Sequence, residues 1–175
     1  MSSSVADYQA RRIVTGLDAD GRSTIASDEN SRTRAVTPTF TCVDVFKLDS
    51  VPSAVTVENA LTDEVVLQPE PGALTIRMVT FPPDSEWQGS EGYKEAMAAI
   101  GSDSLDSEDE IDGLHETDTI DFITMVSGEI WAVLEGKETL LKAGDTLIQR
   151  GTKHAWSNRT DGPVTFVATM ISATR

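Results

Sequence analysis

Two histidines, His115 and His154, and the carboxylate of Asp121 are the side chains best suited to chemistry in this 175-residue sequence. The chain has no other histidine, so any imidazole chemistry must use one or both of these. Two imidazoles and a carboxylate that converge in a pocket can bind a divalent transition metal with positions left open for water or substrate. Without a metal, the same groups can serve as acid and base around an organic molecule. A histidine beside a strand is also often a hydrogen-bonded structural residue, and the residues alone leave both interpretations open.

The strand expected to begin at His154 turns alternate side chains to the same face. His154, Trp156 and Asn158 therefore share one face, which we expect to point into the interior of the protein. The corresponding set on an earlier strand is Asp121, Ile123 and Met125. These two faces would bring the candidate site together.

Four further side chains are predicted to bind a substrate beside the histidines. Aromatic and long apolar side chains on inward faces would suit a flat or aromatic ligand, although ordinary core packing explains each of them equally simply. The predicted substrate-binding residues are Met125, Trp131, Gln149 and Trp156.

Short strands are expected to position this site. Apolar and β-branched runs alternate with glycine and proline turn signals about every eight to ten residues, and this pattern is typical of strands. In the C-terminal part we expect strands at 122–126, 130–134, 138–142, 146–149, 154–157 and 164–171. Further strands are expected at 39–46, 65–67 and 73–81, and a short helix at 92–100. This pattern predicts an all-β, antiparallel barrel or sandwich, since no alternation of strands and helices is present.

Two polar segments flank these strands. Residues 1–38 are predicted to be a polar N-terminal extension with a turn at 18–21, and residues 39–175 to be the barrel. Residues 102–112 hold six acids in eleven positions, which is typical of a solvated loop.

The charge balance excludes several classes of partner. The sequence holds 14 basic and 29 acidic residues, for a net charge of −15, and its pI is near 4.3. Such a surface repels phosphate backbones and anionic lipid, so neither nucleic acid nor a membrane is an expected partner. One cysteine, Cys42, and no apolar leader at the N-terminus favour a cytoplasmic protein.

The segment HETDTIDFITMVSG, from His115 to Gly128, resembles the first signature motif of the cupin superfamily. His115 matches the first histidine of that motif, Asp121 its acid, which is usually glutamate, and Gly128 its closing glycine. Thr117 stands where the motif has a second histidine. The resemblance therefore implies a site with one of the usual four metal ligands replaced.

The segment GDTLIQRGTKHAWSN, over residues 144–158, resembles the second cupin motif. Gly151, His154 and Asn158 match its glycine, histidine and asparagine, while Gln149 stands where that motif usually has proline. Each of the two histidines thus falls in one motif.

The resemblance implies an antiparallel β-barrel or jelly roll with an N-terminal extension and a short helix before the first motif. It also implies a divalent metal (zinc, iron, manganese or nickel) on His115, Asp121 and His154, which would be the catalytic residues as well. We expect a homodimer that acts as a lyase or isomerase, by decarboxylation or dehydration, on a small organic acid, aromatic or polyketide-like molecule. An iron-dependent dioxygenase and a non-catalytic cupin that only binds a small molecule are the alternatives.

Overall fold

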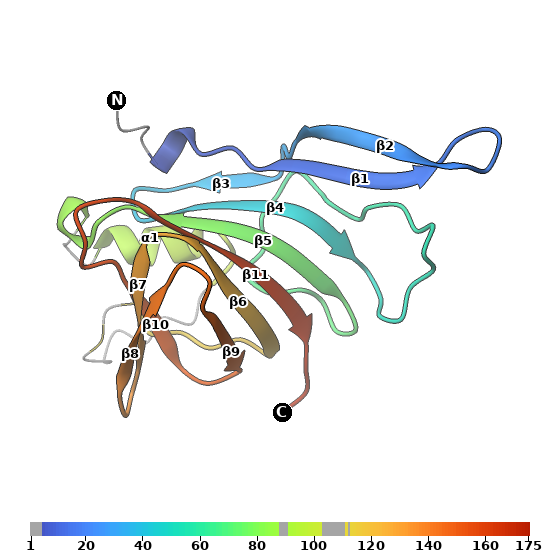
Figure 1. The fold of residues 1–175 in the computed structure, drawn as a ribbon. Coiled ribbons are helices and arrows are strands. Elements are labelled where there is room, and N and C mark those ends of the chain that lie inside the picture. The colour runs from blue at the N-terminus through green and yellow to red at the C-terminus, as the bar shows by residue number, and fades with distance from the viewer. Residues whose placement is uncertain (1–4, 88–90, 103–110, 112) are drawn as a thin grey trace.

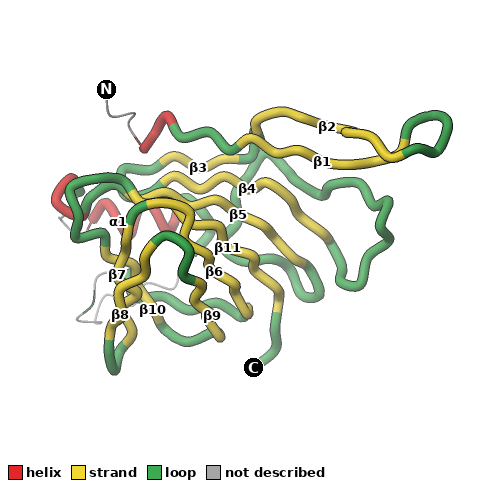
Figure 2. Tube along the Cα trace, viewed as in Figure 1, coloured by secondary structure: helices red, strands yellow, loops and turns green. Residues whose placement is uncertain are grey.

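The computed structural model describes residues 5–87, 91–102, 111 and 113–175 (Figure 1). Strands make up most of the regular structure, and short helical segments join them (Figure 2). The strands are β1 (Arg11–Leu17), β2 (Ser23–Asn30), β3 (Arg34–Val36), β4 (Thr41–Leu48), β5 (Leu74–Phe81), β6 (Thr119–Ser127), β7 (Glu129–Leu134), β8 (Glu138–Lys142), β9 (Thr146–Arg150), β10 (His154–Ser157) and β11 (Val164–Ser172). The helical segments are the 3₁₀ turns η1 (Val5–Asp7) and η2 (Asp84–Glu86) and the α-helix α1 (Glu91–Ala98).

Two antiparallel sheets form the body of the protein. The larger has six strands in the order β3-β4-β5-β11-β6-β9, and the smaller has three in the order β10-β7-β8. The chain passes from one to the other at Gly128, where φ is +73° and a Cβ atom would lie 3.1 Å from the backbone of Val164. Only glycine adopts that conformation in that space without strain. The all-β, antiparallel jelly-roll prediction is confirmed.

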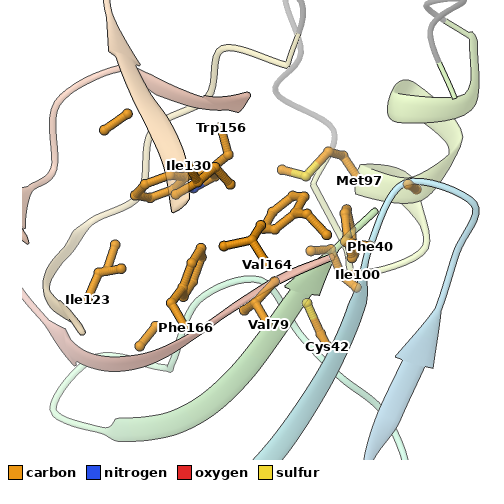
Figure 3. Packing of buried hydrophobic residues seen from close by; sticks show 14 of the residues in the cluster. Phe40, Cys42, Val79, Met97, Ile100, Ile123, Ile130, Trp156, Val164 and Phe166 are labelled. Carbon is orange, nitrogen blue, oxygen red and sulfur yellow. The ribbon is translucent and has the colours of Figure 1, made fainter. Parts of the chain in front are cut away.

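The alternation of β6 shows how the sequence directs side chains inward. Thr119, Asp121, Ile123 and Met125 are buried on one face, while Phe122 on the other face is 41% exposed. The same period of two recurs, less strictly, on β11, which pairs with β6, and also on β5, which pairs with the other edge of β11. These inward faces and the helix α1 enclose an apolar core (Figure 3).

Most predicted elements of the C-terminal half are confirmed within one to three residues, and the helix expected at 92–100 is α1. The strand expected at 65–67 was wrong, because these residues form a loop: the side chain of Arg77 binds the carbonyl oxygens of Val66 and Leu67. The acidic loop at 102–112 lies almost entirely outside the described residues.

The N-terminal extension carries a hairpin that the sequence did not reveal. β1 and β2 pair only with each other, around the predicted turn at 18–21, and the hairpin extends away from the two sheets (Figure 1). β3 then joins the edge of the six-stranded sheet beside β4. In the part of the chain that the structure describes, no helix is long and apolar enough to cross a membrane.

Candidate functional site

The two histidines are brought together by a two-way backbone bridge. The N–H of His115 donates to the carbonyl of His154 at 3.0 Å, and the N–H of His154 donates to the carbonyl of His115 at 2.9 Å. The centroids of their rings are 4.4 Å apart. Residues 39 positions apart in the sequence therefore present their imidazoles side by side at the start of β10.

Both imidazoles are held in the same way. The Nδ1 of His115 lies 2.9 Å from the carbonyl oxygen of Gly113, and the Nδ1 of His154 lies 2.9 Å from that of Thr152. A carbonyl oxygen can only accept, so each Nδ1 carries the proton and donates it. In the neutral ring, Nε2 is then the nitrogen with a lone pair to offer.

Burial keeps both rings neutral. His115 and His154 are 7% and 4% exposed. Burial and, to a smaller extent, the neighbouring His115 together lower the pKa of His154 to about 3, against the opposing effect of its hydrogen bond to Thr152. Burial also lowers the pKa of His115, against its hydrogen bond to Gly113. At neutral pH the pair therefore offers unprotonated nitrogens and no positive charge.

Asp121 is the buried acid of the site. It is 3% exposed on the inward face of β6, and its Oδ1 has no hydrogen-bond partner within the described part of the chain. Burial raises the pKa of Asp121 to about 6, while the hydrogen bond to Thr119 and the charge of Arg77 oppose the shift. A buried oxygen without a partner is costly, and this one can accept a hydrogen bond from a ligand or a water molecule.

The three groups line one interior cavity of about 70 Å³. Its walls are mostly apolar and come from strands of both sheets and from α1, with Phe40, Trp156 and Phe166 among the aromatic side chains (Figure 3). Apolar walls with a few polar groups are the kind of lining that sites for organic molecules have.

Among the predicted substrate-binding residues, Trp156 lines this cavity and the other three do not. Met125 is buried in the core. Trp131 lies on a half-buried face of β7, where the guanidinium of Arg159 stacks 4.7 Å from its ring centroid. Gln149 is buried and donates from Nε2 to the carbonyl and hydroxyl oxygens of Thr152, at 2.6 and 2.8 Å.

The cavity also holds residues that the sequence did not single out. Arg77 is 3% exposed and pairs with Asp44, with Nε 2.5 Å from Oδ1. It interrupts an apolar strand, and a lone arginine at such a position is the signal that could have marked it. Tyr93, Met97 and Ile100 enter the cavity from α1 and the turn after it, and their spacing of four and three residues is that of one helix face.

The three predicted metal ligands lie at one cavity without forming a compact metal cluster in the described residues. His115, Asp121 and His154 line the same cavity. No group of three or more histidine, cysteine, aspartate or glutamate side chains in the described ranges is placed to hold a metal. Thr117, at the position of the missing histidine, donates or accepts at the hydroxyl of Thr119, 2.7 Å away.

Comparison with known proteins gives short sequence matches. The chain is 47% identical over 47 residues to phomopsin biosynthesis cluster protein C' of Diaporthe leptostromiformis, which is 26% of this chain and 25% of that protein. It is 47% identical over 45 residues to oryzines biosynthesis cluster protein J of Aspergillus oryzae, 25% of each. The matches thus span about a quarter of the length of these curated relatives.

A solved structure and a family model are also similar to this chain. The cupin domain of Cnp3 from Schizosaccharomyces pombe aligns over 94% of this chain and 89% of its own, with 12% identity and a TM-score of 0.47. Residues 107–170 match the family Cupin_2, described as a cupin domain. This segment holds both histidines and Asp121. Residues 107–170 of this chain are therefore similar to a cupin domain.

Proposed function

We propose that this protein binds a small, largely apolar carbonyl compound in its interior cavity and moves a proton on it, as an isomerase or a lyase. The observation that carries the proposal is the buried Oδ1 of Asp121, which has no partner in the described residues and lines the same cavity as two neutral imidazoles. Each of these groups can bind a ligand atom without first breaking a strong internal ion pair.

Asp121 is the group best matched to carry the proton. A general base works best when its pKa lies near the working pH, and the pKa of Asp121 is raised to about 6. The pKa of His154, lowered to about 3, makes that ring a weak base. The Nε2 atoms of His115 and His154 instead accept a hydrogen bond from a hydroxyl group of the substrate, such as the one that a dehydration removes.

In the proposed reaction, the Asp121 carboxylate takes a proton from the carbon next to a carbonyl group. The C–H bond breaks, and its electron pair moves to the carbonyl oxygen as an enolate forms. Return of the proton to a different carbon completes an isomerisation. Loss of a neighbouring hydroxyl group, which leaves as water with the proton from Asp121, completes a dehydration.

The charges around the cavity favour an uncharged substrate over an organic acid. Arg77 is the basic side chain among the described lining residues, and Asp44 already neutralises it. Its other nitrogens donate to the carbonyl oxygens of Val66 and Leu67. A substrate carboxylate would find no spare cation there, whereas an aromatic or polyketide-like ketone would fit the apolar walls.

The relatives support a role in making a small molecule. The matched proteins of Diaporthe leptostromiformis and Aspergillus oryzae are named as members of biosynthesis clusters. No step of the proposal runs through a metal.

Exchange of carbon-bound hydrogen in D₂O tests the proposal. Phenylacetone and phenylpyruvate share a benzyl carbonyl skeleton but differ in charge, and NMR follows deuterium entry at the benzylic carbon. We expect the wild type to accelerate exchange of phenylacetone more than of phenylpyruvate. Asp121→Asn should lower the accelerated rate about 10² to 10⁴-fold, as expected for loss of a general base. Asp161→Asn, at an exposed carboxylate, is the matched control.

Equal exchange rates for the wild type and Asp121→Asn with both compounds would overturn the catalytic proposal. If phenylacetone then still changed the fluorescence of Trp156, compared with a Trp156→Phe variant, the protein would be a cupin that binds without catalysis.

We further propose that the protein is a homodimer assembled through the β1–β2 hairpin. A lone two-stranded hairpin is marginally stable in water. One face of this hairpin presents Ile13, Leu17 and Ile25, which are 52%, 65% and 55% exposed. A second copy of the chain that covers this face would bury it.

A further inference from the structure

The backbone anchors of the two histidines are supported by different parts of the fold. His115 is anchored on the carbonyl of Gly113 and His154 on that of Thr152, each at 2.9 Å. The two rings therefore make the same kind of hydrogen bond, but different residues contact the two carbonyl groups that accept them. Each ring is therefore held in place by a different neighbour.

The anchor of His154 is held by Gln149. The carbonyl oxygen of Thr152 accepts from Nδ1 of His154 and also from Nε2 of Gln149, which lies 2.6 Å away. Nε2 of Gln149 also lies 2.8 Å from the hydroxyl of Thr152. Gln149 is the last but one residue of β9, which pairs with β6 and is fixed in the large sheet. The orientation of His154 thus depends on the sheet.

The anchor of His115 is covered by the helix. Gly113 has a φ of +78°, and a Cβ atom built on it would lie 2.6 Å from Cε1 and 2.7 Å from Cζ of Tyr93. The ring of Tyr93 therefore lies directly against the Gly113 backbone. Tyr93 is in turn packed between Trp87 and Phe40, with ring centroids 5.6 and 6.3 Å away. The orientation of His115 thus depends on α1.

The helix that carries Tyr93 is also a wall of the cavity. Tyr93, Met97 and Ile100 line the cavity from this side. α1 shares no ladder hydrogen bonds with the described strands, and the N–H of Leu67 donates to the carbonyl of Ile100 at the turn after it. A cavity of about 70 Å³ is smaller than the roughly 150 Å³ that holds a benzene molecule. An aromatic ligand would have to displace part of the wall, and α1 is the part not fixed by strand pairing.

We propose that Tyr93 and Gln149 are the positioning residues of the histidine pair, with Tyr93 orienting His115 through Gly113 and Gln149 orienting His154 through Thr152. Displacement of α1 by a ligand then reorients His115 and leaves His154 in place. His154 is the fixed member of the pair, and His115 is the member that responds to occupancy of the cavity. The consequence for catalysis rests on the proposed function, but the positioning itself does not.

Long-range ¹H–¹⁵N NMR of the histidine rings tests this in the full-length protein, because the two rings give two separate patterns. His115→Gln and His154→Gln assign them. Tyr93→Leu keeps a buried apolar side chain but removes the ring from Gly113, and Gln149→Met keeps the length but removes the donor. We expect Tyr93→Leu to shift the ring nitrogens of His115 toward a mixture of tautomers and to leave those of His154 unchanged. Gln149→Met should do the reverse.

Exposed neighbours supply the matched controls. Lys94→Ala on the outer face of α1 and Arg150→Ala on β9 should leave both patterns as in the wild type. Tyr93→Phe retains the ring and should restore the wild-type pattern of His115. If Tyr93→Leu does not fold, Gly113→Ala places a methyl group against the same ring and should perturb His115 alone.

Both rings shifting together in each variant, or neither shifting, would overturn the proposal. The readout is independent of turnover, so a failed exchange experiment with phenylacetone leaves this result standing. Conversely, an active enzyme whose two histidines shift together would refute the positioning roles alone.

Discussion

His115 and His154 are joined through their backbones, each N–H donating to the carbonyl of the other at 3.0 and 2.9 Å, so that their rings stand 4.4 Å apart. This bridge lies outside the ladders of the two sheets and ties the segment before β6 to the first residue of β10. Because both residues are buried, the bridge places two neutral imidazoles at one cavity beside Asp121.

The buried His154 makes stability fall in mild acid. Its pKa is near 3 in the folded chain and about 6.5 in the unfolded chain, so between these values the unfolded chain binds a proton that the folded chain does not. The free energy of unfolding should therefore decrease as pH falls from about 6.5 toward 3. His154→Gln should reduce that decrease by about 2 kcal/mol between pH 7 and pH 4.5. Urea unfolding at both pH values measures it, and an unchanged pH dependence in the variant would contradict it.

Asp121 acts in the opposite direction. Its folded pKa of about 6 lies above its ordinary value of 3.8, so above pH 3.8 the unfolded chain gives up a proton that the folded chain retains until about pH 6. Burial of the carboxyl group thus destabilises the protein more and more as the pH rises from 3.8 to about 6. Above that pH the destabilisation is constant. Relative to its effect at pH 4, Asp121→Asn should stabilise the protein at pH 8 by about 2 kcal/mol. Thermal unfolding at the two pH values checks this, and an equal effect at both would refute the raised pKa.

The Arg77–Asp44 pair is a buried ion pair, with side chains 3% and 6% exposed. Removal of one partner leaves an uncompensated charge in the interior, so Asp44→Leu should destabilise the protein by about 3 to 5 kcal/mol. The double variant Arg77→Met with Asp44→Leu should be more stable than Asp44→Leu alone. Urea unfolding of Asp44→Leu, Arg77→Met and the double variant measures the coupling between the two side chains. Strictly additive losses of stability would show that the pair does not act as a unit.

The hairpin face should control assembly. Leu17→Asp introduces a charge at a side chain that is 65% exposed, so it should leave the monomer fold intact and prevent a second copy from covering the face. Light scattering after size exclusion should give the mass of a dimer for the wild type and of a monomer, 18.9 kDa, for the variant. Thr24→Asp, at an exposed position of β2, is the control for added charge. Equal masses for wild type and Leu17→Asp would contradict the proposed interface.

The fold was largely predictable because its signals are local. Alternating apolar residues and glycine turns set the strands from β6 to β11, and the period of two correctly predicted that Asp121 and Trp156 point inward. The hairpin was not predictable, because β1 and β2 carry few apolar residues and neither packs into the core.

The site was predictable only in part, since its remaining members are brought together by contacts between distant segments. Tyr93 reaches the cavity because α1 covers one end of it, and Arg77 faces inward because Asp44 on the next strand neutralises it. Trp131 has the same residue type as Trp156 but lies on β7 beside Arg159, and nothing in the local sequence distinguishes the two. Gln149 was expected to touch the substrate, and the structure places it behind His154.

Both imidazoles are neutral at pH 7, and long-range ¹H–¹⁵N NMR of the wild-type protein at that pH tests this most directly. With two histidines in the chain, the spectrum holds two ring patterns. We predict that both rings are neutral, with the proton on Nδ1 and an unprotonated Nε2. A charged imidazolium at either position, or a proton on Nε2, would contradict the account.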